Sequence, residues 1–363
     1  MAYTFNHDLL AGEKDIAEAR KDFPDIVFAL HNPAMKTVFA PIDKRANAAK
    51  RKSRQWGVLA VALATLALML AAGEVLYHGF DKNTVRLIAL IGAIAGITSV
   101  LIGVFGVMFR ARKLRWLADR FSTERMRQFH FQHYIAFARD ILDGAADEQK
   151  ARDYLRRRHE DFEAFKSSVI DKADDALHHL VEAEDPGVGL IFPEGPAPIA
   201  ADRPHLDEYF NAYRVLRFDR QIGYCDLMLR EKGAFWTYAP VKQARLIGTV
   251  AMVCVFAILV LHGFVFVGAI ADIPALKSPE VHVAAIWAAI IALAARTIEE
   301  GFQPETEIER LRQYRLTLKR IFDRFNTTDD PNEKLRAMTD LEKLAFEEMV
   351  LFLRGNYEAQ YVM

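Results

Sequence analysis

The chain has 363 residues, enough for roughly two or three ordinary domains, and a formal net charge of −1 at pH 7. This near-neutral charge argues against a protein that holds nucleic acid through bulk positive charge, so no nucleic-acid partner is expected. The two cysteines, Cys225 and Cys254, are too few for a disulfide framework or a cysteine-rich metal site. Residues 1–30 lack the apolar segment of a signal peptide, so insertion into a membrane would depend on internal segments.

Four apolar stretches approach the roughly 20 helical residues that a bilayer core about 30 Å thick requires. They run from Trp56 to about Tyr77, from Leu87 to Phe109, from Leu246 to Ala271 and from Val281 to Ala295. The fourth is short, but Ser278 and Pro279 supply a helix cap and a first-turn proline, and Arg296 is expected to close it. A buried hairpin in a soluble protein is the alternative, although the second and third stretches are long for core helices. We therefore predict an all-α integral membrane protein with four transmembrane helices.

The connections 78–86 and 272–280 are short, so the four stretches form two hairpins. Basic residues gather at the ends away from these connections: Lys44, Arg45, Lys50, Arg51, Lys52 and Arg54; Arg110, Arg112, Lys113 and Arg115; Lys242 and Arg245; and Arg296. The tips carry only Lys82, Arg86 and Lys277. Because cytoplasmic loops hold the excess of lysine and arginine, we predict a multi-pass protein of the bacterial inner membrane with both termini cytoplasmic.

This topology divides the chain into five segments. They are a cytoplasmic N-terminal segment at 1–55, hairpin 1 at 56–109, a cytoplasmic helical region at 110–243, hairpin 2 at 244–296 and cytoplasmic C-terminal helices at 297–363. The C-terminal helices are expected to separate near Asp329. No segment shows the alternation of apolar and polar residues that a half-buried strand requires.

The cytoplasmic helical region is predicted to contain one long break. Helix is expected from 110 to about 183, with a turn near Gly144, and again from Leu206 to Lys232. Between them, proline and glycine mark 185–204 as a loop. Its apolar Leu190-Ile191-Phe192 is expected to dock on other elements.

A repeated motif follows each hairpin at about the same distance. It reads Glu124-Arg125-Met126-Arg127-Gln128-Phe129 and Glu309-Arg310-Leu311-Arg312-Gln313-Tyr314. The shared register predicts an internal repeat of a hairpin and a long exit helix. Residues four apart share a helix face, so we predict a juxtamembrane coupling face that forms salt bridges between helices. That face comprises Glu124, Arg127, Gln128, Glu309, Arg312 and Gln313. A solvated charged face is the alternative.

Two titratable residues lie inside the apolar stretches, where a polar group is costly. Glu74 lies about 26 Å along the first stretch and His262 about 24 Å along the third, at 1.5 Å per helical residue. A contact between them near the outer mouth of a pore or bundle is one hypothesis. The alternative is that Glu74 reaches the outer interface while His262 bonds to a backbone group.

The second stretch carries small residues on one helix face. They are Gly92, Gly96, Ser99, Gly103 and Gly106. Such a stripe lets helices approach closely, so packing is the first interpretation and the lining of a narrow conduit is the second.

We find no motif of a catalytic or cofactor site: there is no phosphate loop, HExxH, CxxC or GxSxG. His130 and His133 are three residues apart on a predicted helix, but two ligands are too few for a stable metal site. We therefore expect no enzyme activity, no cofactor and no bound metal.

A membrane hairpin followed by a charged helix with an E-R-x-R-Q-aromatic element resembles the SLATT proteins (SMODS/SLOG-associating transmembrane effectors), here in a duplicated, two-hairpin form. The residues that carry the resemblance are Lys113, Trp116, Arg120, Glu124 and Arg127, then Glu305, Glu309, Arg312 and Tyr314, together with Phe39-Ala40-Pro41-Ile42-Asp43 and Glu358-Ala359-Gln360-Tyr361-Val362-Met363. The likeness covers about half of the chain, and the region 140–210 has no counterpart in it.

The resemblance implies an effector of prokaryotic antiviral defence, of the abortive-infection kind, that forms or opens a pore in the inner membrane. It implies membrane lipid as one partner, a homo-oligomer, and a partner protein or nucleotide-type signal on the cytoplasmic side as the trigger. A membrane-anchored scaffold and a constitutive ion channel are the alternatives.

Overall fold

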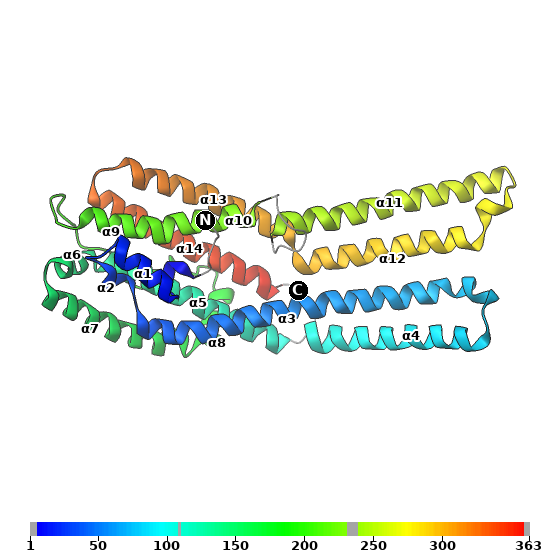
Figure 1. Ribbon diagram of the computed structural model, residues 1–363, viewed down its shortest axis with the longest axis horizontal. Helices are drawn as coiled ribbons and strands as arrows, with labels where there is room; N and C mark the ends of the chain where they lie inside the picture. Colours follow the sequence, from blue (N-terminus) through cyan, green and yellow to red (C-terminus); the bar gives the residue numbers. More distant parts are fainter. Residues whose placement is uncertain (1–5, 108–109, 231–238, 359–363) are drawn as a thin grey trace. The chain divides into compact units, whose positions relative to one another are not determined.

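The computed structural model describes residues 6–107, 110–230 and 239–358, and every element within these ranges is a helix (Figure 1). The described residues form two compact units. We call residues 6–48, 111–230 and 309–358 the core unit, and residues 49–107, 110 and 239–308 the span unit. Three segments that are distant in the sequence therefore build the core unit together.

The span unit contains the apolar helices. They are the second half of α3 (Pro33–Ala72), the 3-10 helix η2 (Gly73–Gly79), α4 (Lys82–Leu101), the π-helix η3 (Ile102–Val107), α11 (Pro240–Ile270), the 3-10 helix η6 (Pro274–Lys277) and α12 (Pro279–Phe302). Four helices of the described chain are long and apolar enough to cross a membrane, which confirms four candidate spans. Many of their large apolar side chains are exposed, as they are in helices that face lipid.

The ends of these helices differ from the prediction in two places. Helix α3 begins at Pro33, well before Trp56, because the basic residues between them favour a helix. Arg296 does not close α12. The helix continues to Phe302 and ends at Gln303, which adopts a left-handed conformation with φ 45° before Pro304. The predicted N-terminus of α12 is confirmed, with Ser278 as the extended cap and Pro279 in the first turn. The predicted end of the second stretch at Phe109 lies outside the described residues.

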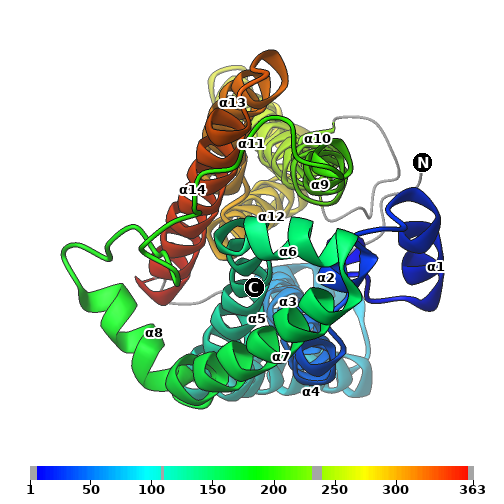
Figure 2. The ribbon, with the colours of Figure 1, turned by 90° about the vertical axis from the view of Figure 1, so that its left-hand side faces the viewer.

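The core unit contains the remaining helices. They are η1 (His7–Leu9, 3-10), α1 (Glu13–Asp22), α2 (Val27–Leu30), the start of α3, nearly all of α5 (Arg110–Ala136), α6 (Ala138–Ala146), α7 (Glu148–Phe165), η4 (Lys166–Ile170, π), α8 (Ala173–Glu182), α9 (Leu206–Tyr213), η5 (Arg214–Phe218, π), α10 (Asp219–Met228), α13 (Pro304–Thr327) from Glu309 onward and α14 (Pro331–Glu358). Within this unit α5 lies between α7 and α14 (Figure 2).

Aromatic rings of α5 hold the core unit together. Phe129 is fully buried and lies 4.9 Å from Phe165 and 5.6 Å from Phe162 of α7, measured between ring centroids. On the other side of α5, Tyr134 stacks on Tyr209 of α9 at 4.4 Å, and each hydroxyl donates to the other residue's carbonyl oxygen. Stacked rings with satisfied hydroxyls fix helix positions more firmly than aliphatic contact alone.

The predicted break near Gly144 lies at Asp147 in the structure. Helix α6 runs through Gly144 and ends at Ala146, and Asp147 caps α7 by accepting from the amide of Gln149 at 2.8 Å. Gly144 instead allows close packing, because a Cβ there would lie 2.9 Å from the ring of Phe28. The glycine at position 144 is therefore explained by the close packing of helices and not by a turn.

Candidate functional site

The first copy of the repeated motif joins α5 to the N-terminal segment. Arg127 donates to both carboxylate oxygens of Glu124 at 3.0 Å, and its Nε lies 2.8 Å from the carboxylate of Asp8 in η1. Burial would raise the pKa of Glu124, but the positive charges of Arg120 and Arg127 lower that pKa to about 2. These side chains form a connecting network within the core unit and do not form a solvated face.

The second copy is more exposed. Glu309, Arg312 and Gln313 face solvent, and Gln313 donates to Glu309 at 2.8 Å within the same helix, as residues four apart do. Arg310 is the exception, because it pairs with Glu348 of α14. For most of this copy the solvated face is therefore the correct interpretation.

In both copies of the motif, however, an arginine side chain contacts an aromatic ring of α14. Arg125 lies over the ring of Phe346 at 5.2 Å, and Arg310 lies over Phe352 at 5.1 Å. Cation–π contacts of this kind stabilise modestly when partly buried. Helix α14 thus receives one arginine from each motif.

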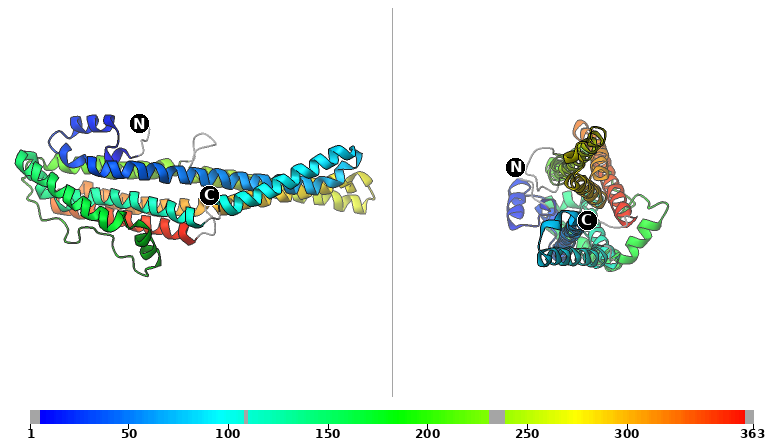
Figure 3. Two further views of the ribbon diagram at one scale, coloured as in Figure 1. Left: turned by 90° about the horizontal axis from the view of Figure 1, so that it is seen from below. Right: turned by 90° about the vertical axis from the view of Figure 1, so that its right-hand side faces the viewer.

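The loop between α8 and α9 crosses the face of α5 and α14 and contains no helix or strand from 183 to 205 (Figure 3). Arg125 donates to the carbonyl oxygen of Gly189 at 3.0 Å, and burial lowers the pKa of Arg125 to about 10. Gln132 of α5 donates to the same oxygen at 3.3 Å and accepts from the amide of Ile191 at 2.7 Å. We call residues 185–200 the strap.

The far end of the strap is held in the same manner. Asn332, in the first turn of α14, accepts from the amide of Ile199 at 2.9 Å and donates to its carbonyl oxygen at 3.1 Å. Arg139 of α6 donates to the carbonyl oxygen of Pro198 at 2.7 Å. The sequence analysis identified neither Gln132 nor Asn332, because an isolated amide in a helical sequence carries no pattern.

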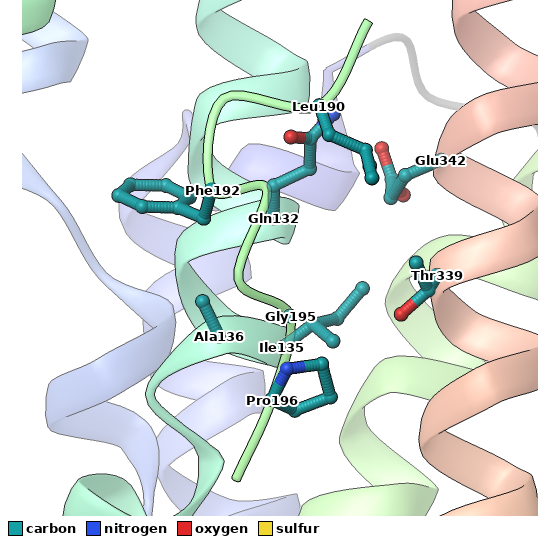
Figure 4. Close-up of a pocket in the computed structure, with 9 residues that line it drawn as sticks. All are labelled: Gln132, Ile135, Ala136, Leu190, Phe192, Gly195, Pro196, Thr339 and Glu342. Carbon is teal, nitrogen blue, oxygen red and sulfur yellow. The ribbon is translucent and has the colours of Figure 1, made fainter. Parts of the chain in front are cut away.

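The apolar part of the strap docks on α5, as predicted for Leu190-Ile191-Phe192. Phe192 meets the rings of Phe129, His133 and Phe137 at 5.4 to 5.8 Å. A small cavity remains beneath the strap, with about 240 Å³ of empty space, part of it open to solvent. Figure 4 shows its lining: Gln132, Ile135 and Ala136 from α5, Leu190, Phe192, Gly195 and Pro196 from the strap, and Thr339 and Glu342 from α14.

An ion pair lies at the base of this site. Arg217 of η5 is 2% exposed and Glu342 of α14 is fully buried, and they form two hydrogen bonds of 2.8 and 2.9 Å. Tyr213 donates to Glu342 at 2.9 Å, and Arg217 also lies 4.6 Å from the ring centre of Phe131. Burial disfavours the charged guanidinium, but Glu342 outweighs it and raises the pKa of Arg217. Burial raises the pKa of Tyr213 well above its ordinary value, so its hydroxyl keeps its proton.

The histidines of α5 do not converge on a common ligand. His133 has both ring nitrogens within reach of protein groups, the Tyr154 hydroxyl at 3.3 Å and the Asp161 carboxylate at 3.2 Å. His130 is 3% exposed, and its Nε2 has no hydrogen-bond partner among the described residues. Burial lowers the pKa of His130 to about 3, so it is neutral at physiological pH. Their role is packing inside the aromatic core.

One group in the described chain has donor atoms close enough for a metal. Oxygen and nitrogen atoms of Asp25, His205 and Glu208 lie within 4.8 Å of one another. Glu208 already accepts from the amides of Asp25 and Ile26 at the start of α2, and His205 lies 2.9 Å from Asp25. Helix capping and an ion pair therefore account for these three residues.

The hypothesis of a Glu74–His262 contact is not supported by the span unit. Nδ1 of His262 hydrogen-bonds the carbonyl oxygen of Ile258, one turn earlier in α11, at 2.9 Å. No hydrogen bond or ion pair joins these two described side chains, and Glu74 lies exposed in η2. Trp287 of α12 instead donates to the carbonyl oxygen of Met69 in α3 at 2.8 Å. Met69 lies in the last turn of α3, just before the 3-10 helix η2 begins at Gly73.

Part of the small-residue stripe packs α4 on α3. A Cβ at Gly92 would lie 3.6 Å from Leu70, and one at Gly96 would lie 3.6 Å from Ala67. Ser99 is buried and donates to the carbonyl oxygen of Ala60 at 2.7 Å. Gly103, in the π-helix, has no atom of the described residues within 4 Å of a Cβ position. The side-chain surroundings of Gly106 lie outside the described part of the chain.

These sites have no known template. No protein-family model, characterised protein or solved structure matches the chain. The resemblance to SLATT proteins therefore stays a prediction, and the function must be argued from the geometry.

Proposed function

We propose that this chain is a multi-pass membrane effector of a prokaryotic defence system, which opens a leak in the inner membrane when its cytoplasmic helices are triggered. The observation that carries the proposal is helix α3. It is a single helix from Pro33 to Ala72, with Phe39 in the buried core of the core unit and Leu66 exposed in a membrane-length apolar stretch. Helix α3 continues through its internal Pro41, so a change in core packing can pass along it.

The composition of the spans supports a leak between helices over coupled transport. The four apolar stretches carry no aspartate, glutamate, lysine or arginine between residues 56–73, 87–109, 246–271 and 281–295. Coupled transporters place polar groups and broken helices at mid-membrane. In this proposal both termini face the cytoplasm, and several copies assemble through exposed apolar faces such as that of α11.

The test is the membrane potential of bacteria that express the intact chain from an inducible promoter, followed with a voltage-sensitive dye. We expect depolarisation by the intact chain and a several-fold slower response from Gly96→Leu, because leucine at 96 must push against Ala67 of α3. Gly103→Leu is the matched control: it adds the same side chain at another small residue of the predicted stripe, in η3, where a Cβ meets no described atom within 4 Å. Membrane fractionation confirms that each variant is inserted.

The alternatives give different results in the same assay. A membrane-anchored scaffold predicts an unchanged potential on expression of the inserted chain, also when the strap is disturbed by Gly189→Ala. A constitutive channel predicts depolarisation that is equally fast in the intact chain and in Gly189→Ala. A leak that is triggered through the strap predicts that the two rates differ.

A further inference from the structure

The segment of α3 that precedes its apolar stretch carries positive charge without acidic neighbours. Residues 50–54 read Lys-Arg-Lys-Ser-Arg, and from residue 44 to its end at Ala72 the helix contains no aspartate or glutamate. Ion pairs between residues three or four apart, which neutralise most charged helix faces, are therefore missing from this segment. A compensating negative charge has to come from outside the helix.

Two of these basic side chains, those of Arg51 and Lys52, are exposed. No hydrogen bond or ion pair joins either of them to another residue in the described part of the chain. Arg54 differs, because it lies over the ring of Phe302 of α12, 5.2 Å from the ring centroid. Arg54 thus takes part in the packing of the span unit, whereas Arg51 and Lys52 are open to a partner.

This exposed basic pair lies on the same helix face as exposed apolar side chains. Val58 stands seven residues after Arg51, and Leu59 stands seven residues after Lys52. Residues seven apart share a face, since seven residues make almost two helical turns. Val58 is 40% exposed and Leu59 is 43% exposed, as side chains that face lipid are. The face that would meet the lipid tails therefore continues directly into the basic pair.

The spacing along the helix axis fits the depth of a lipid headgroup layer. At 1.5 Å per residue the basic pair lies about 10 Å before Val58 and Leu59. Trp56, which is 36% exposed, lies between them and is of the residue type that marks membrane interfaces. The polar layer of a bilayer is roughly 5–8 Å thick on each side of the hydrocarbon core. Arg51 and Lys52 would thus lie level with the lipid phosphates.

The two helix ends of hairpin 2 carry less uncompensated charge. In α11, the exposed Arg245 stands seven residues before Met252, which is 70% exposed, so a single basic residue occupies the same register. In α12, Arg296 forms an ion pair with Glu299, and Glu300 follows it. An anionic partner is therefore attracted more strongly to α3 than to either of these ends.

We propose that Arg51 and Lys52 form a binding surface for the headgroups of anionic phospholipids, which hold α3 at a fixed depth in the bilayer. The net negative charge of such a headgroup complements the two cations, whereas a zwitterionic headgroup carries no net charge. The proposal rests on the membrane placement in the proposed function, but it does not depend on a leak.

The test titrates phosphatidylglycerol or phosphatidylcholine onto the full chain in detergent micelles and counts bound lipids by native mass spectrometry. The double variant Arg51→Gln with Lys52→Gln removes both charges and keeps residues that favour a helix. Lys319→Gln with Arg320→Gln is the matched control, because it removes an adjacent exposed basic pair from α13 in the core unit. We expect the first variant to bind phosphatidylglycerol at least about tenfold more weakly than the intact chain, and the control to stay within about twofold.

Three results would overturn the proposal: equal losses in the two variants, equal binding of both lipids by the intact chain, or displacement of the lipid by soluble glycerol phosphate, which would indicate a site for free phosphate. In about 1 M salt the difference between the intact chain and the first variant should shrink, since charges are then screened within about 3 Å. A difference that salt does not change would also contradict the proposal, because it would assign the effect to packing. Membrane fractionation separates this proposal from the proposed function: an inserted chain without preference for phosphatidylglycerol contradicts only the former, and a chain that does not insert contradicts both.

Discussion

Replacing Arg217 by methionine is expected to lower the free energy of unfolding of the core unit by about 3–5 kcal/mol, because it leaves a buried charge without its partner. Glu342 is fully buried, and Arg217 supplies two of its hydrogen bonds. The Tyr213 hydroxyl that remains is a neutral donor and cannot balance the carboxylate. The free energy of unfolding is measured by denaturant titration in detergent micelles. A separate hydrogen-exchange measurement reports the local stability of α9, η5 and α14.

Two variants separate the charge effect from lost packing. The double variant Arg217→Met with Glu342→Leu removes both charges and is expected to recover most of the loss, since well-packed apolar replacements of a buried pair are often near neutral. Arg324→Met breaks an exposed pair between α13 and Asp340 of α14, where the expected cost is below about 1 kcal/mol. Equal losses of unfolding free energy for Arg217→Met and Arg324→Met would show that burial does not make the Arg217–Glu342 pair more important than an exposed ion pair.

Acidification from pH 6.5 to 4.5 is expected to destabilise the core unit by up to about 3 kcal/mol through His130 alone, at about 1.4 kcal/mol per pH unit. Its folded pKa of about 3 lies below the unfolded value near 6.5. The unfolded chain therefore takes up a proton in this window and the folded chain does not, so stability is full above pH 6.5 and falls as the pH falls. Burial is the main cause, and the nearby Arg158, His133, Arg217 and His31 add to it.

The slope of unfolding free energy against pH tests this prediction. His130→Leu removes the proton-binding group and should flatten the slope between pH 6.5 and 4.5. His159→Leu, on the exposed face of α7, is the control and should leave the slope unchanged.

Below about pH 4.5 the loss of stability should become steeper with falling pH. The pKa of Glu124 is lowered to about 2 in the folded chain, so the unfolded chain takes up a proton at this carboxylate first. A slope that His130→Leu does not change would assign the effect to other groups, with His133 the first to examine, since burial also lowers its pKa.

The strap and the buried pair occupy the same part of the core unit. Glu342 closes the cavity beneath the strap, and Gln132 lines it (Figure 4). Displacement of the strap would therefore open the cavity that borders this buried charge to solvent.

The sequence by itself determined the helical class, the four apolar spans, the break before Pro331 and the docking of Leu190-Ile191-Phe192. These properties follow from local composition: long uncharged stretches need a nonpolar environment, and proline interrupts helical hydrogen bonding. The helix ends were less predictable. Arg296 and the basic run before Trp56 are compatible with a helix, and only Gln303 and Pro33 mark the true boundaries.

Only the tertiary structure decided which polar residues act together. Glu124 and Glu309 occupy the same position of one motif, yet the first lies in a buried network and the second faces solvent, because each helix meets different neighbours. The polar residues around the strap lie on α5, η5 and α14, which are far apart in the chain, and they share no sequence pattern. They are Gln132, Arg217, Asn332 and Glu342. Their pairing depends on long-range packing, which a local periodicity does not encode, and for that reason this cluster could be recognised only in the folded chain.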